Sequence, residues 1–283
     1  MRFLLCLSLL FSSSLMAESK PLKALYITEY GNLYHAYEKQ AQFLKDKLPE
    51  LMNVELTVIG HNAMETLQTL QKPDFSRDYD LIIYNACLAD SQDSEAVENV
   101  IQQVETARKP IVFLHCAMHN FRFTSAGKVA RYGAAVEQAT AAWDKSHPGV
   151  AFPRWSQLTG MDSSRHELPG PLWIKKSGEH PVTQNLSDSW ISNWDELYVA
   201  ESLQSDVVPL YSAGRFLTRS QTVAWVRETS GGRVFATTLG HNFQTLKNKD
   251  FLALLQRGIL WTVYGLADDG SIKPGFESQI LDQ

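Results

Sequence analysis

The stretch Gly-Gly-Arg-Val-Phe-Ala-Thr-Thr-Leu-Gly-His, residues 231–241, has the pattern of a buried β-strand that ends in Gly240 and His241. In an α/β fold, the carboxyl ends of the strands line the crevice in which ligands bind. A histidine placed one residue past such a strand therefore predicts a functional side chain at that edge of a sheet.

Strand and helix patterns alternate along the first half of the chain. Strands are expected at residues 22–28, 54–59, 81–84 and 111–114. Helices are expected between them at residues 34–48, 63–70 and 94–107. The first of these helices is predicted from apolar residues at helical spacing. The alternation predicts an α/β fold of three layers, with a mostly parallel sheet covered by helices on both faces.

The second half of the chain is less regular. Proline and glycine interrupt residues 122–171, which we interpret as a long, loop-rich insertion over the sheet edge and as the wall that faces the substrate. Further short strands are expected at residues 172–175, 197–200, 207–212, 222–227 and 233–238, and a last helix at 251–264. We expect a single domain over residues 18–283, with a core at about 22–266.

The first 17 residues have the layout of a secretory signal peptide. Arg2 precedes an apolar run from Phe3 to Met16, which is too short to span a bilayer, and Ala17 suits a cleavage site. We therefore expect an exported, periplasmic or secreted protein without a transmembrane segment in the mature chain. The net charge of −5 and the absence of a basic tract argue against nucleic acid and anionic membranes as partners.

Removal of the signal peptide leaves two cysteines, Cys87 and Cys116. Both follow apolar runs that look like neighbouring parallel strands, so their side chains could lie close together. In an oxidising compartment they could form a disulfide, and the alternative is a pair of buried free thiols. The sequence does not decide between the two.

Several motifs resemble the ThuA-like family, known as trehalose utilisation protein-like. They are Trp194-Asp195-Glu196-Leu197-Tyr198, His180-Pro181-Val182-Thr183, the strand at 222–228, the Gly-His strand end and the helix from Phe251 to Trp261. The resemblance spans about residues 22–266. It implies a fold related to class I glutamine amidotransferases and flavodoxin-like proteins, and a role in trehalose or related glycoside utilisation.

Four residues from separate segments are expected to meet at one edge of the sheet. They are the candidate catalytic residues His35, His115, Glu196 and His241. Imidazoles with a carboxylate suit either a divalent metal that polarises a carbonyl, or metal-free acid–base chemistry on a sugar carbon. If a metal is present, these same four residues are its expected ligands, although the chain contains no short zinc motif such as His-Glu-x-x-His.

Other residues near these segments have less direct expected roles. Candidate substrate-binding residues are Tyr34, Trp194, Tyr198 and His166, and further aromatic residues nearby are Tyr30, Trp143 and Trp155. Either Asp195 or Glu196 could instead cap a turn. His180 is interpreted as part of a structural turn, and His61, His119 and His147 as surface or hydrogen-bonded residues.

The sequence thus predicts an exported enzyme that acts on a small-molecule carbohydrate or keto-sugar derivative, of hydrolase, lyase or isomerase type. A divalent metal is a possible cofactor. The alternatives are a non-catalytic carbohydrate-binding protein and a cysteine amidase that uses Cys116 as its nucleophile. The sequence does not indicate the oligomeric state.

Overall fold

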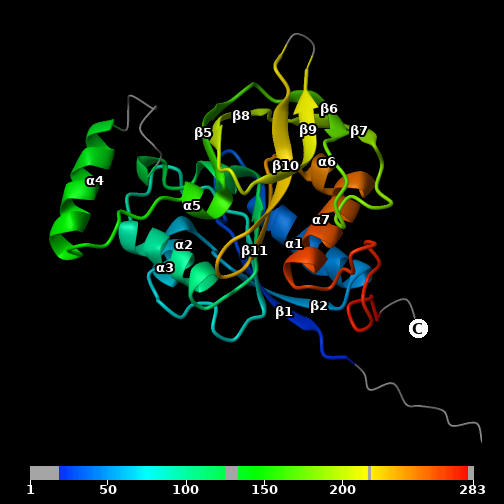
Figure 1. Cartoon of the computed structure of the whole chain (residues 1–283), viewed down its shortest axis with the longest axis horizontal. Coiled ribbons are helices and arrows are strands. Elements are labelled where there is room, and N and C mark those ends of the chain that lie inside the picture. The colour runs from blue at the N-terminus through cyan, green and yellow to red at the C-terminus, as the bar shows by residue number, and fades with distance from the viewer. Residues whose placement is uncertain (1–18, 125–132, 216–217, 280–283) are drawn as a thin grey trace, which may run out of the picture.

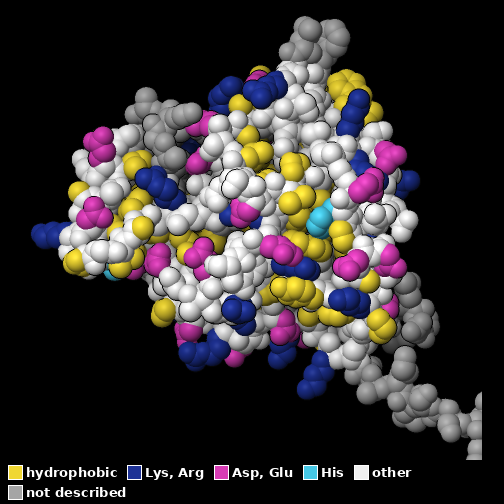
Figure 2. All heavy atoms as spheres, in the orientation of Figure 1, with side chains coloured by type: hydrophobic (Ala, Val, Ile, Leu, Met, Phe, Trp, Pro, Cys, Tyr) yellow, Lys and Arg dark blue, Asp and Glu magenta, His cyan; other side chains and the backbone are white. Residues whose placement is uncertain are grey.

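The computed structural model describes residues 19–124, 133–215 and 218–279. The expected signal peptide, residues 1–17, lies outside this range. Within it, no helix is both long enough and apolar enough to cross a bilayer. On the face shown in Figure 2, basic side chains are interspersed with acidic ones and are not gathered in one patch.

Five strands form the parallel half of a nine-stranded sheet (Figure 1). Their order is β2-β1-β3-β4-β11, the 2-1-3-4-5 order of doubly wound folds that bind ligands at the switch point beside the first strand. The strands are β1 (Leu22–Ile27), β2 (Val54–Ile59), β3 (Leu81–Tyr84), β4 (Ile111–Leu114) and β11 (Arg233–Thr237).

Four antiparallel strands extend this sheet beyond β11 in the order β10-β9-β6-β7. They are β10 (Gln221–Glu228), β9 (Val208–Gly214), β6 (Gly170–Lys176) and β7 (Ser189–Asp195). A separate two-stranded sheet pairs β5 (Met161–His166) with β8 (Tyr198–Leu203). The α/β class is confirmed, although the sheet has a larger antiparallel part than the sequence suggested.

Helices cover both faces of the sheet. Along β1, Ala24 and Tyr26 face one apolar cluster, which includes α1 and α7, whereas Leu25 and Ile27 face another, which includes α3. This alternation follows from the two-residue period of a strand. The principal helices are α1 (Tyr37–Leu51), α2 (Ala63–Leu70), α3 (Ser94–Glu105) and α7 (Lys249–Thr262). The short ones are α5 (Ser156–Thr159), α6 (Phe243–Leu246), η1 (His115–His119) and η2 (Arg122–Thr124).

The inserted segment differs from its expected role as one wall over the site. Its helix α4 (Gly133–Ser146) stands at a far corner of the molecule (Figure 1) and buries Trp143 next to Phe152. Among the described residues of the insertion, His166 at the end of β5 reaches the expected site, 3.4 Å from Glu196. The expected wall over the site was therefore wrong for α4, and the contact of β5 with a substrate stays a prediction.

Candidate functional site

The turn after β4 places His115 in the interior. The residue has a φ of +46°, in the left-handed region that costs a non-glycine residue about 1–2 kcal/mol, and its side chain is fully buried. Its Nδ1 lies 2.8 Å from the carbonyl oxygen of Thr238, just beyond β11. Because a carbonyl can only accept, Nδ1 carries the proton and Nε2 of the neutral ring presents its lone pair.

The loop after β1 fixes His35 in the same tautomer. Asn32 Oδ1 accepts a hydrogen bond from the backbone N–H of Tyr34 at 2.9 Å, which identifies this atom as the amide oxygen. His35 Nδ1 lies 3.1 Å from that oxygen and therefore donates to it. The ring also stacks on Tyr37, with 4.9 Å between the ring centres. His35 thus also directs an Nε2 lone pair inward.

The buried carboxylate of Asp195, at the end of β7, binds the backbone of the next residue and of the turn after β11. It accepts hydrogen bonds from the backbone N–H groups of Gly240 at 3.0 Å, His241 at 3.2 Å and Glu196 at 2.9 Å. Burial raises its pKa to about 6, while these N–H donors oppose the rise. Asp195 is therefore the turn-capping residue of the pair, and Glu196 is free to face the histidines.

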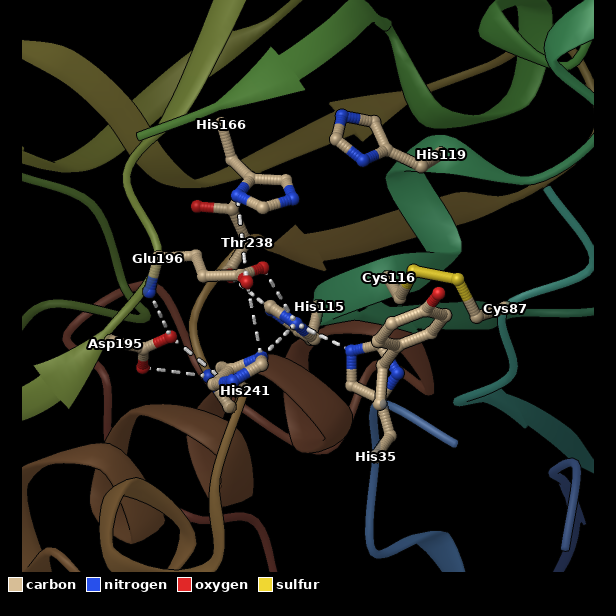
Figure 3. A network of polar contacts seen from close by, with 12 residues as sticks. His35, Cys87, His115, Cys116, His119, His166, Asp195, Glu196, Thr238 and His241 are labelled. Atoms are coloured by element: carbon tan, nitrogen blue, oxygen red, sulfur yellow. Dashed lines mark hydrogen bonds and ion pairs between the residues drawn. A yellow bond between two sulfur atoms is a disulfide. The ribbon is translucent and has the colours of Figure 1, made fainter. Parts of the chain in front are cut away.

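The four expected residues do come together (Figure 3). The central atom is Nε2 of His115, which lies 3.1 Å from Nε2 of His35 and 3.2 Å from Nδ1 of His241. Glu196 Oε2 lies 3.4 Å from the same nitrogen. The three imidazoles each offer a ligand atom, and these atoms lie within 4.8 Å of one another.

The imidazoles of His35 and His115 are uncharged in the folded protein. Burial lowers the pKa of His115 well below its ordinary value, and burial with the neighbouring His241 and His166 lowers the pKa of His35 to about 3. Both rings are neutral near pH 7, so their facing Nε2 lone pairs have no proton to share. Two nitrogens bound to one tetrahedral zinc are about 3.3 Å apart, which is close to the spacing observed here. The triad could hold such a metal.

Glu196 links this cluster to its more exposed side. Its Oε1 lies 3.5 Å from His241 Nδ1 and 3.4 Å from His166 Nδ1. Burial first, and then the nearby charge of Asp195, raise the pKa of Glu196 to about 7. The side chain of His166 is 35% exposed, so it is the part of this set that faces solvent.

His119 belongs to the same region, although its sequence context gave no support for a site. It is buried, its Nε2 lies 3.0 Å from Ser163 Oγ, and its ring stacks on Tyr198 with 4.0 Å between centres. His166 lies against the same tyrosine. The spacing of four residues between His115 and His119 was the available sequence signal that both histidines lie in the same region.

The aromatic candidates differ in their distance from the histidine cluster. Tyr198 is buried beside His115, His119 and His166, with 5.3 Å between its ring centre and that of His115, and its contact with a substrate stays a prediction. Tyr34 is 80% exposed and Trp194 is 53% exposed, and their proposed contacts with substrate stay predictions. Trp155 is a core residue that donates to the carbonyl of Ala117.

The two cysteines form a disulfide, Cys87–Cys116, which settles the alternatives that the sequence left open. A sulfur in a disulfide is not a free thiolate, so the structure is incompatible with Cys116 as a nucleophile. The cysteine amidase alternative is therefore wrong for this form of the protein.

The remaining histidines lie in structural or surface positions, as expected. His180 Nδ1 accepts from the N–H of Val182, within a turn closed by Thr183. His61 pairs with Glu65 on the surface, and His147 stacks on Trp143.

We expect Asp195→Asn to destabilise the fold and to displace His241. The amide nitrogen would face backbone N–H groups that now donate to a carboxylate, at a cost of about 1–3 kcal/mol. Urea unfolding measures the loss of stability, and the histidine NMR signals report the displacement. Asp78→Asn, at an exposed carboxylate, is the matched control. Equal stability of the two variants would contradict the role given to Asp195.

The fold and site together define a class of protein. It is a doubly wound α/β domain with a buried histidine–carboxylate cluster at the carboxyl edge of its sheet. A family model described as "ThuA: Trehalose utilisation" matches residues 23–262. The chain belongs to the ThuA family.

Solved structures agree with this assignment at the level of the fold. A putative ThuA-like protein from Parabacteroides merdae has a TM-score of 0.63 at 16% identity, covering 92% of this chain and 96% of its own. Another, from Bacteroides uniformis, has a TM-score of 0.62 at 17% identity, with coverages of 90% and 96%. A β-galactosidase from Bacillus circulans has a TM-score of 0.52 at 12% identity, covering 92% of this chain and 32% of its own. No curated protein matches the chain.

Proposed function

We propose that this protein is an exported enzyme that acts on a carbohydrate or keto-sugar derivative, with a divalent metal held by His35, His115, His241 and Glu196. One observation carries the proposal: the Nε2 atoms of His35 and His115 face each other at 3.1 Å, and both protons are committed to oxygen acceptors on the other side of the rings. A cation between these two nitrogens would bind both lone pairs and remove the repulsion between them.

The protein residues have separate roles in this proposal. Asn32 and the Thr238 carbonyl orient two ligand rings, as the hydrogen-bonded partners of metal-bound histidines generally do. Glu196, 3.4 Å from His115 Nε2, supplies the carboxylate ligand, and His166 at the exposed side contacts sugar hydroxyls. When bound, the metal supplies a Lewis acid that polarises a carbonyl oxygen.

The substrate class and the compartment have different support. A carbohydrate follows from the family's link to trehalose utilisation, and a keto-sugar from the suitability of a metal site for a carbonyl group. Export rests on the signal-peptide pattern of residues 1–17.

The test combines metal analysis with a substrate screen. The full chain, expressed with its leader, is purified from the exported fraction, and its zinc, iron, manganese, cobalt and nickel are measured. Metal-loaded and chelator-treated samples are then incubated with disaccharides and with their keto derivatives. We expect bound metal, and turnover of a keto-sugar that stops on chelation. His61→Ala, at an exposed histidine, is the unaffected control.

Two outcomes would reject this proposal. Sugar binding without turnover would leave a non-catalytic carbohydrate-binding protein. A protein that neither contains nor binds any of these metals would remove the metal-assisted mechanism.

A further inference from the structure

The sheet register brings the two cysteines together. Tyr84 on β3 pairs with Phe113 on β4, and each cysteine follows its strand partner by three residues. The Cα atoms of Cys87 and Cys116 consequently lie 5.1 Å apart. Because hydrogen bonds between the strands already hold these ends together, the pair stays adjacent when the disulfide is broken.

The cysteine pair also lies against the histidine cluster (Figure 3). Both sulfur atoms and a ring nitrogen of His35 lie within 4.8 Å of one another. Cys116 directly follows His115 in the chain, and it is almost completely buried. His35 is thus common to two possible ligand sets, one with His115 and His241 and the other with the two cysteines.

We infer that the reduced protein has a second, thiolate-containing metal site formed by Cys87, Cys116 and His35, and that the disulfide assigns His35 to the histidine site. Thiolates are strong ligands for zinc and other soft or borderline metals. Two of them beside His35 compete with His115 and His241 for the same ion. Oxidation removes both thiolates from this competition.

The chemistry requires an external reductant of the dithiol class. The dithiol gives two electrons and two protons to the Cys87–Cys116 bond, becomes a cyclic disulfide itself, and leaves two thiols on the protein. Each thiol then loses its proton to solvent as its sulfur binds the metal. Cys87 is only partly buried, which gives the reductant access to the bond.

Cobalt(II) is the probe, because a cobalt–thiolate bond produces a near-ultraviolet charge-transfer band that imidazole and carboxylate ligands do not. The full chain carries Cys6→Ser in every variant, so that its thiols come from Cys87 and Cys116 alone. Protein reduced with dithiothreitol is desalted without oxygen and titrated with cobalt, in parallel with oxidised protein. Circular dichroism confirms that each sample is folded.

Variants separate the two sites. We expect the thiolate band in the reduced parent and in reduced His241→Ala, but not in the oxidised parent or in a double variant that carries both Cys87→Ser and Cys116→Ser. We expect His35→Ala to weaken cobalt binding by the reduced protein about 10-fold or more. A folded, reduced parent without the band would overturn the inference, as would His35→Ala that binds as tightly as the parent.

The inference rests on the proposed function only through His35, the ligand that both sites share. Failure of the thiolate site can be distinguished from failure of the histidine metal site. Oxidised protein that binds no cobalt would reject the histidine metal site, while the band in the reduced protein would still report the thiolate site. Binding by oxidised protein without a band after reduction would reject the thiolate site alone.

Discussion

His115→Ala is expected to abolish tight metal binding and turnover. The Nε2 atom of His115 is the one that contacts His35, His241 and Glu196, at 3.1, 3.2 and 3.4 Å. Loss of a residue that only orients a metal ligand already costs 10–100-fold in affinity, so loss of the central ligand should cost more than about 100-fold. Equilibrium dialysis and keto-sugar turnover measure the two effects.

The control for His115→Ala must separate metal loss from unfolding. His115→Gln keeps a polar side chain of similar reach without an imidazole, and circular dichroism checks both variants. His180→Ala removes a partly buried histidine of the Pro181 turn, outside the cluster. Folded His115 variants with metal content and turnover equal to the parent would show that the cluster is not a metal site.

The metal-free protein is expected to lose stability steeply as the pH falls from about 6.5 toward 3. His35 has an ordinary pKa of 6.5, but the folded protein keeps it neutral down to about pH 3 because of burial and the neighbouring His241 and His166. Between these values the unfolded chain binds more protons, so lowering the pH favours unfolding. The lowered pKa values of His115 and His119 act in the same direction.

Glu196 opposes this loss in part. Its pKa, raised to about 7 in the folded protein, lets the folded chain bind the extra proton between about pH 7 and 4.5, so its contribution to stability is lost as the pH rises. Asp195, whose pKa is raised to about 6, acts in the same sense as Glu196. Each pKa unit corresponds to about 1.4 kcal/mol, and the shift of His35, from 6.5 to about 3, is larger than that of either carboxyl group.

Urea unfolding of chelator-treated protein at several pH values tests the two opposite effects of pH on stability, that of the histidines and that of Glu196. His35→Gln should flatten the dependence of stability on pH, and Glu196→Gln should steepen it. A parent whose free energy of unfolding is constant between about pH 6.5 and 4 would contradict the assignment of buried, neutral histidines.

The strands of the parallel half were predictable from sequence because they are buried on both faces. Such strands read as continuous apolar runs, as at Leu81–Tyr84 and Ile111–Leu114. The strands β5 and β7 were missed because some of their buried positions are polar. Ser163 contacts His119, Ser192 contacts Thr245, and Asp195 binds backbone N–H groups. These partners are distant in sequence, so hydrophobic periodicity carries no signal of them.

The meeting of the three histidines was predictable from the parallel topology. His35, His115 and His241 all follow parallel strands, and the carboxyl ends of such strands share one edge. The tautomers were not predictable, since they depend on the Thr238 carbonyl and on the rotamer of Asn32. The position of Tyr34 was also beyond the sequence, because helix α1 begins at Tyr37 and leaves the preceding loop exposed.

The single carboxylate of Asp195 has a mechanical consequence. It joins the end of β7, in the antiparallel extension, to the residues that follow β11, in the parallel half. Asp195 therefore couples the positions of Glu196 and His241, together with the hydrogen bond that Asn242 Nδ2 donates to the Trp194 carbonyl. A displacement of the end of β7 would be transmitted through this carboxylate to the backbone of Gly240 and His241, so the spacing between acid and imidazole would persist.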